Sequence, residues 1–207
     1  LIEEERARGG ALFVYGLSMG GMLAYDAVVM TGKADGLIAS CFLDPTRKDV
    51  RRSVVRLPWM AGLIDPLFAL TPRLFDALPV PMALTGNMRA ISNSAAVTDA
   101  ILADRLAGGN AMPAGFLRTW LQSPPLAPPE SFDACPVLMV HPAADHWTDV
   151  SVSDDVFSRL PVLKRRVMLE NCGHFSIETP GSDQHDHAIA EFVNAIVERR
   201  PMRERLV

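Results

Sequence analysis

A G-x-S-x-G pattern near the start of the chain places Ser18 between Gly16 and Gly20. In this pattern a sharp turn from a strand to a helix projects the serine hydroxyl clear of the backbone, where it can act as a nucleophile. Both flanking positions are glycine, and we expect that a side chain at either of them would collide with the adjoining strand or helix. The apolar run 11–15 before the turn and the helical segment 22–30 after it supply the required context.

A serine nucleophile also needs hydrogen-bond donors for the oxyanion that forms when it attacks a carbonyl group. Met19 follows the serine at the predicted start of the helix. The first N–H groups of a helix have no acceptor within it, and the helix dipole there favours negative charge. We therefore predict the Met19 N–H as one donor of an oxyanion hole.

The serine further needs a base, and the base needs an acid that fixes its tautomer and stabilises the imidazolium. Two apolar runs, 136–141 and 166–170, predict buried strands. Asp145 lies in the loop after the first of them and His174 in the loop after the second. Because the carboxyl ends of parallel strands meet at one edge of a sheet, we predict that Asp145 is the acid and His174 the base.

Other acidic and imidazole side chains leave alternatives open. Asp149 lies in the same loop as Asp145, and Asp44 ends the preceding predicted strand, so either could supply the acid. His141 is expected to be buried within its strand, and His146 to pack beside the acid. Asp145 is favoured because it stands directly past the end of a strand.

Two further features could suggest chemistry of another kind. The His and Asp cluster at 183–187 could suggest a metal site, but it lies near the start of the predicted last helix, about Asp186–Arg199. That position favours acidic capping with exposed imidazoles, so we predict no metal site there. Cys172 is close to His174 in sequence but has no strand-to-helix turn of its own, and we expect it to be a neighbour of the site.

Strand patterns alternate with helical patterns at both ends of the chain, which predicts a parallel sheet with right-handed crossovers. Residues 1–45 and 134–207 are therefore predicted to form an α/β core. The interval 46–133 does not alternate; it contains helix-like apolar segments with proline breaks and ends in the Pro-rich stretch 123–129. We predict that this interval is a helical cap inserted between the second and third strands.

The predicted cap holds more large apolar side chains than a short insertion needs. Most of them are expected to hold the cap helices together, and some could line a site for an apolar acyl chain: Trp59, Met60, Leu63, Ile64, Leu67, Phe68, Leu70, Leu74 and Phe75. Met82, Met88 and Met112 could add adaptable lining. This composition favours a small-molecule substrate with an apolar chain.

Composition argues against several other classes of protein. A net charge of −4 and the lack of a Lys/Arg stripe argue against nucleic-acid binding. A run of about 18 uncharged apolar residues is also lacking, so we expect no transmembrane segment. Cys41, Cys135 and Cys172 have neither a disulfide-framework pattern nor metal-ligand spacing, which is typical of reduced thiols in a cytoplasmic protein.

Three motifs carry a resemblance to a known family: residues 16–21 (Gly-Leu-Ser-Met-Gly-Gly), 142–145 (Pro-Ala-Ala-Asp) and 173–175 (Gly-His-Phe). On these the chain resembles the α/β-hydrolase superfamily, in particular its lysophospholipase and monoacylglycerol-lipase-like branch. The resemblance covers essentially the whole chain and implies an α/β-hydrolase fold, a mostly parallel sheet flanked by helices with an inserted cap. It also implies a Ser-Asp-His triad that cleaves carboxylic esters through an acyl-enzyme, without a metal or organic cofactor.

The same triad serves other reactions, so a peptidase, thioesterase, acyltransferase or C–C bond hydrolase stays an alternative, as does a non-catalytic ligand-binding member of the fold. Relative to the family, the first four strands and the loop with the second oxyanion donor would lie before Leu1. We therefore expect this sequence to be the C-terminal part of a longer protein, in which both edges of the strand 11–15 are paired.

Overall fold

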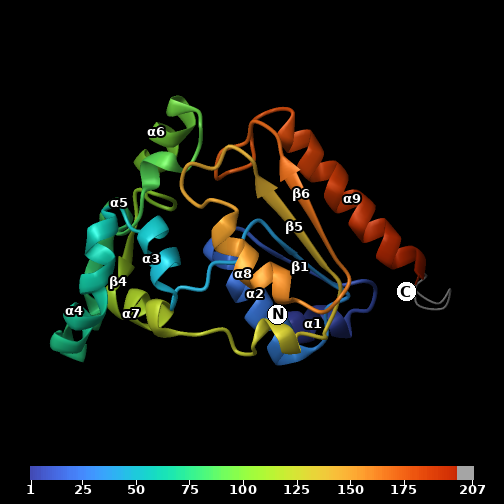
Figure 1. The fold of residues 1–207 in the computed structure, drawn as a ribbon, viewed down its shortest axis with the longest axis horizontal. Helices are drawn as coiled ribbons and strands as arrows, with labels where there is room; N and C mark the ends of the chain where they lie inside the picture. Colours follow the sequence, from blue (N-terminus) through green and yellow to red (C-terminus); the bar gives the residue numbers. More distant parts are fainter. Residues whose placement is uncertain (200–207) are drawn as a thin grey trace.

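The computed structural model describes residues 1–199, which fold around a four-stranded parallel sheet (Figure 1). In spatial order its strands are β1 (Phe13–Gly16), β2 (Gly36–Ala39), β5 (Val137–Pro142) and β6 (Lys164–Leu169). Leu138 in the middle of β5 lies opposite Ile38 of β2 on one side and Arg165 of β6 on the other. The α/β core predicted from the alternating pattern is therefore observed; its last residues, 200–207, lie outside the described part of the chain.

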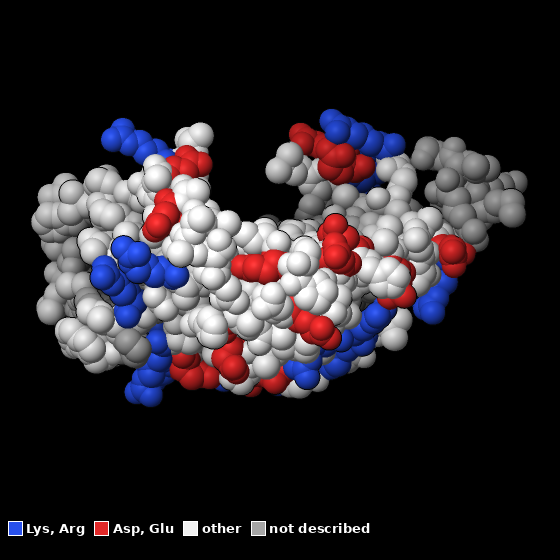
Figure 2. Space-filling model, turned by 90° about the horizontal axis from the view of Figure 1, so that it is seen from above, with Lys and Arg blue, Asp and Glu red and all other residues white. Residues whose placement is uncertain are grey.

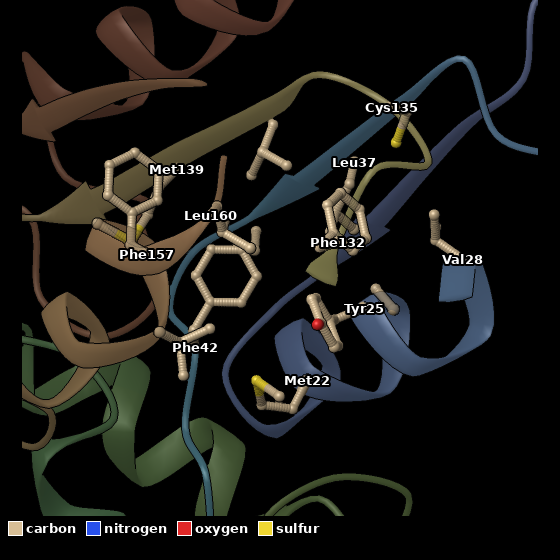
Figure 3. Close-up of a cluster of buried hydrophobic side chains, with 14 of the residues drawn as sticks. Met22, Tyr25, Val28, Leu37, Phe42, Phe132, Cys135, Met139, Phe157 and Leu160 are labelled. Carbon is tan, nitrogen blue, oxygen red and sulfur yellow. The ribbon is translucent and has the colours of Figure 1, made fainter. Parts of the chain in front are cut away.

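Helices cover both faces of this sheet because side chains alternate between the faces along each strand. Leu37, Val137 and Met139 pack with α2 (Met19–Thr31) and α8 (Ser151–Arg159). In this layer Met22, Tyr25 and Val28 of α2 point toward the strands, and Phe132 stacks on Tyr25 with ring centroids 5.0 Å apart (Figure 3).

The opposite face of the sheet is covered by α9 (Gly181–Arg199), which crosses it on the right of Figure 1. Ile38, Leu138 and Val140 form a second apolar cluster there, with Ala188 and Phe192 of the helix packed against them. The helix begins at Gly181 rather than near Asp186 as predicted, because the backbone N–H groups of its first turn find acceptors upstream, such as Ser182 N–H donating to Glu178 O.

Residues 46–133, here called the cap, separate β2 from β5 in the chain and form the left part of Figure 1. Its helical elements are α3 (Lys48–Val54), η1 (Pro58–Leu63), α4 (Ile64–Leu70), η2 (Arg73–Ala77), α5 (Met82–Thr85), η3 (Met88–Ala90), α6 (Ala95–Ala103), α7 (Ala114–Gln122) and η4 (Pro129–Ser131). Arg118 of α7 ties several of these together, since it donates to Asp76 Oδ1 at 2.9 Å and to the Phe68 and Thr71 carbonyls.

The prediction of a purely helical cap was wrong in one place. Pro79–Pro81, expected to be a proline break, forms the short strand β3, which pairs antiparallel with β4 (Ala111–Pro113). Prolines are tolerated there because each strand of a two-stranded ladder has an outer edge on which no N–H has to pair.

On the face of the molecule seen in Figure 2, charge is spread without a dominant sign. Lys and Arg side chains are interspersed with Asp and Glu over the face shown in the space-filling view, which is hollowed between two raised parts (Figure 2). Among the described residues, no helix is both long enough and apolar enough to cross a lipid bilayer.

Candidate active site

Ser18 stands at the turn between β1 and α2 with φ 54° and ψ −125°, a backbone conformation that a residue with a side chain rarely adopts. Ser40, in the segment after β2, holds this turn from both sides. Its hydroxyl oxygen accepts the Ser18 N–H at 2.8 Å, and its own N–H donates to the Gly16 carbonyl at 3.0 Å. The strained turn is therefore fixed by a buried side chain from the neighbouring strand.

The glycines around the turn differ in what they do. A Cβ at Gly16 would lie 2.1 Å from the Gly20 carbonyl oxygen, so the expected steric need is present there. The same expectation for Gly20 was wrong, since a Cβ on it would meet no atom within 4 Å. Gly21 carries the second steric requirement instead, because its Cβ would lie 1.9 Å from the Cys41 carbonyl oxygen.

Ser18, His174 and Asp145 form one hydrogen-bonded chain. The Ser18 hydroxyl oxygen lies 2.7 Å from His174 Nε2, and His174 Nδ1 lies 2.8 Å from Asp145 Oδ2. The side chains of the histidine and the aspartate are each only 2% exposed. Three residues that are far apart in sequence thus meet at the carboxyl edge of the sheet, in the geometry that a serine, its base and the orienting acid require.

The carboxylate of Asp145 is surrounded by donors. Its Oδ1 accepts the backbone N–H groups of Trp147 at 2.8 Å and Thr148 at 3.0 Å, and its Oδ2 accepts the Thr148 hydroxyl at 2.7 Å. Burial by itself would raise the pKa of Asp145, but the hydrogen bonds from His174 and Thr148 outweigh it and hold that pKa below its ordinary value. The carboxyl group of Asp145 is therefore ionised at neutral pH.

The alternative acids serve the local backbone. Asp44 accepts the N–H and the hydroxyl of Thr46, which fixes the turn that leads into the cap. Asp149 accepts the Ser151 N–H at 2.9 Å and so fixes the turn that leads into α8. Both residues have the turn role that is common for aspartate after a strand.

The alternative imidazoles also lie elsewhere. His141 is 1% exposed in β5, as expected, and its Nδ1 lies 3.0 Å from the Ser40 carbonyl oxygen. Burial lowers the pKa of His141, so this ring is neutral at physiological pH. His146 is exposed, although it follows Asp145 directly.

The other features singled out from the sequence do not form a second centre. Cys172 is buried, and its thiol donates to the Glu178 carbonyl at 3.1 Å. In the 183–187 cluster, His185 pairs with Asp186, and its Nε2 lies 3.3 Å from the Tyr15 hydroxyl. Within residues 1–199, no group of three His, Cys, Asp or Glu side chains is placed to hold a metal ion.

Sequence reasoning missed the contribution of Trp147. Its ring centroid lies 4.8 Å from that of His174, and its indole N–H donates to the Val54 carbonyl at the end of α3. The indole also fills the space beside Gly86, where a Cβ would lie 2.6 Å from it. No spacing in the sequence could have indicated this contact, because it joins the acid loop to a distant part of the cap.

A cavity of about 860 Å³ extends from Ser18, Met19 and His174 into the cap. This volume is within the range of small-molecule sites. Its wall is mainly apolar and comes largely from the cap, including Leu67, Phe68, Met82, Met88, Met112 and Leu117. Among the described residues that line it, none is Asp or Glu.

The cap residues expected to pack or to line a site differ in where they lie. Ile64, Leu67 and Phe68 line the cavity together with Met82, Met88 and Met112. Phe75 (41%) does not line it but is partly buried, and the side chain of Met60 is not among those that the structure describes. Four others do not line it and are more than half exposed, so they do not hold the cap together from inside: Trp59 (69%), Leu63 (53%), Leu70 (83%) and Leu74 (84%). For these the expectation of internal packing was wrong.

The parallel sheet, its flanking helices and the serine turn define the α/β-hydrolase class. Residues 1–178 match the model of the Hydrolase_4 family, described as serine aminopeptidase, S33, and the chain belongs to this family. The resemblance to α/β-hydrolases inferred from the motifs is thereby confirmed. No curated protein matches the chain.

Solved structures with the same fold include several hydrolases. A monoacylglycerol lipase of Paleococcus ferrophilus is 19% identical with a TM-score of 0.56, over 94% of this chain and 71% of that one. A thermostable carboxyl esterase of Bacillus coagulans is 16% identical with a TM-score of 0.65, over 94% and 68%. A thermophilic esterase of Thermogutta terrifontis is 18% identical with a TM-score of 0.58, over 93% and 68%.

Proposed function

We propose that this α/β-hydrolase is a serine esterase that cleaves carboxylic esters of apolar acyl chains. The observation that carries the proposal is the hydrogen-bonded chain from Ser18 through His174 to Asp145 at one end of a largely apolar cavity. In this proposal Ser18 is the nucleophile, His174 the general base and Asp145 the acid that orients it.

The reaction proceeds as an acyl transfer in two halves. His174 Nε2 takes the Ser18 proton as the hydroxyl oxygen attacks the ester carbonyl, and the tetrahedral oxyanion is held by the Met19 N–H at the start of α2. The imidazolium then protonates the leaving alcohol as the C–O bond breaks. Water, deprotonated by the same imidazole, attacks the acyl-enzyme, and the carboxylic acid leaves with Ser18 restored.

The apolar wall of the cavity favours an apolar acyl group as the part of the substrate that binds there. A methylene group moved from water to such a wall gains about 0.8 kcal/mol. Thioether and aromatic side chains such as Met82, Met112 and Phe68 adapt to chains of different length.

Aminopeptidase activity, which the family description names, is the second candidate, and the wall of the cavity disfavours it. The free α-amino group of a peptide is a cation, and a buried cation needs a carboxylate partner. Arg51 and Arg56 line the cavity, whereas the described lining residues include no Asp or Glu. Among the described residues, the wall of the cavity therefore offers an ammonium group no carboxylate partner.

The test is steady-state hydrolysis of p-nitrophenyl esters from C2 to C16, set against aminoacyl p-nitroanilides. We expect ester cleavage with an optimum at medium or long chains, and a loss of at least about 1000-fold in Ser18→Ala and His174→Ala. The ester activity should also fall at acidic pH, as the imidazole becomes protonated.

Four results would contradict this function. Fluorophosphonate labelling that persists in Ser18→Ala would reject the nucleophile. A flat profile from pH 5 to 8 would reject His174 as the base. Faster turnover of the anilides than of any ester would favour the peptidase, and a sharp optimum at acetate would reject the apolar acyl chain.

A further inference from the structure

One short segment of the cap, residues 91–93, is hydrogen-bonded to the loop that carries His174. The Phe175 N–H donates to the Ile91 carbonyl at 2.9 Å. Glu178 Oε1 accepts the Ser92 hydroxyl at 2.8 Å and the Asn93 N–H at 3.0 Å. The residue after the histidine and a carboxylate further along the same loop are thus both fixed to the cap.

The Glu178 carboxylate also accepts a hydrogen bond from its own loop, on the N-terminal side of His174. Glu178 Oε2 accepts the N–H of Gly173, which directly precedes His174, at 3.1 Å. Both neighbours of the histidine, Gly173 and Phe175, therefore have their N–H groups bonded within this arrangement. The backbone on which the imidazole stands is held at two points.

Asn93 extends the contact to the loop that carries the acid. Its side-chain amide donates to the Ala144 carbonyl at 3.1 Å, one residue before Asp145. The contact leaves no room for a side chain at position 173, since a Cβ on Gly173 would lie 2.8 Å from the backbone nitrogen of Asn93. The absence of a side chain at Gly173 therefore permits the close approach of its loop to Asn93 of the cap.

We propose that Glu178 and Asn93 are positioning residues, which hold His174 and Asp145 in register by clamping the two loops to residues 91–93 of the cap. The proposal rests on the proposed function, since it assigns these residues to the alignment of the base and the acid of the esterase. Neither residue touches the reacting atoms, and each acts through the loop that it holds.

The charge of Glu178 matters because all three groups that contact its carboxylate are donors. Burial would raise the pKa of Glu178, but the Ser92 hydroxyl and the backbone N–H groups of Gly173 and Asn93 hold it below its ordinary value. A glutamine has the same shape but turns an NH₂ group toward at least one of these donors. Glu178→Gln therefore breaks the clamp with almost no change in volume.

The clamp also meets the substrate cavity. Ile91, the first residue of the segment, lines the cavity, as does Met88 three residues earlier. The segment that contacts a bound acyl chain is therefore the segment that positions the base and the acid.

The experiment compares Glu178→Gln and Asn93→Ala with the wild-type chain and with Glu170→Gln as the matched control. Glu170 lies at the end of β6 and is exposed. Active sites are counted by the burst with a fluorophosphonate, so that kcat is expressed per functional serine. The variants are then assayed on one p-nitrophenyl ester from pH 5 to 9.

In Glu178→Gln we expect kcat per titrated site to fall about tenfold or more, because small displacements of reacting groups cost that much or more. KM should change less than about threefold, since the cavity wall stays in place. The midpoint of the acidic limb should move to lower pH, because a misaligned Asp145 stabilises the imidazolium less. Asn93→Ala should change both quantities in the same direction, and Glu170→Gln should change neither.

Wild-type kcat per titrated site together with an unchanged acidic midpoint in both variants would overturn the proposal, whatever their thermal stability. If Glu178→Gln gives no folded protein, Asn93→Ala decides by the same two readouts, because its side chain is exposed. If the wild-type chain hydrolyses no ester, or Ser18→Ala keeps full activity, the proposed function itself fails and the clamp has nothing to position. Ester turnover that depends on Ser18 but not on Glu178 or Asn93 rejects the clamp alone.

Discussion

At the scale of single residues, the site depends on how a buried carboxylate is kept charged. Asp145 has lost most of its contact with water, yet two backbone N–H groups, one hydroxyl and the imidazole replace the lost hydration. Such donors favour the ionised form over the neutral acid. Thr148, which no sequence pattern singles out, contacts both residues, since its hydroxyl also lies 3.3 Å from His174 Nδ1.

Replacement of Thr148 by valine tests this role. The substitution keeps the shape and removes the hydroxyl bond to Asp145 Oδ2, and a hydrogen bond to a charged group contributes about 1.5–3 kcal/mol. We expect kcat on the preferred ester to fall about tenfold or more with little change in KM. Thr119→Val is the control, because the Thr119 hydroxyl bonds only its own helix at Gly115. Equal loss in both variants would contradict the assignment.

At this scale, the sequence allowed prediction of those residues that lie in a distinctive motif or directly after a predicted strand. Ser18 was indicated by its glycines, and Asp145 and His174 by their places after strands. Thr148 and Glu178 were not, because each acts through contacts between loops that come together only in the folded chain.

At the scale of elements, the turn from β1 into α2 is set by how closely the helix approaches the next strand segment. The helix starts against the Cys41 carbonyl, and this approach is possible only because Gly21 has no side chain. Gly20 faces open space, so a side chain at this position would not disturb the packing of the helix.

Alanine substitution at each of the two glycines separates these roles. Gly21→Ala should lower the free energy of unfolding by about 1–3 kcal/mol or more, because the methyl group overlaps backbone that cannot retreat. Gly20→Ala should leave stability unchanged or raise it by up to about 1 kcal/mol, since alanine favours a helix over glycine. Urea unfolding of both variants measures this. A Gly20→Ala protein less stable than Gly21→Ala would contradict the steric explanation.

The order and type of the core elements could be predicted because buried parallel strands and amphipathic helices have clear periodicities. The cap was harder. β3 consists of Pro-Val-Pro, a composition that argues against a strand, and it forms only because β4 arrives beside it from 30 residues further along. Exposed apolar residues such as Leu70 and Leu74 likewise gave no sign in the sequence that they face outward.

At the scale of the whole molecule, two of the carboxyl groups whose pKa values are lowered, those of Asp145 and Glu178, link stability to pH. Asp145 and Glu178 both titrate below their ordinary values of 3.8 and 4.5 in the folded chain. Above about pH 5 both are ionised whether the chain is folded or not, and their contribution to stability is complete. As the pH falls through the ordinary values, the unfolded chain takes up protons first, so stability is lost until the folded groups are protonated too.

Urea unfolding between pH 7 and pH 3 should therefore show a free energy of unfolding that declines below about pH 5. The decline should be shallower in Asp145→Asn and Glu178→Gln, because each variant lacks one of the carboxylates that gain a proton on unfolding. Glu170→Gln should keep the wild-type slope. Parallel curves for the wild type and both variants would show that these two carboxylates do not carry the acid sensitivity.

The attachment of the cap has a consequence for how this scaffold can vary. It leaves from the carboxyl end of β2 and returns to the amino end of the adjacent parallel strand β5, so it crosses from one edge of the sheet to the other, and no strand of the four-stranded sheet lies within it. A donor cap from another hydrolase could be grafted there without rethreading the sheet. To keep the loops of Asp145 and His174 in place, that graft would have to supply an acceptor for the Trp147 indole N–H and donors for the Glu178 carboxylate.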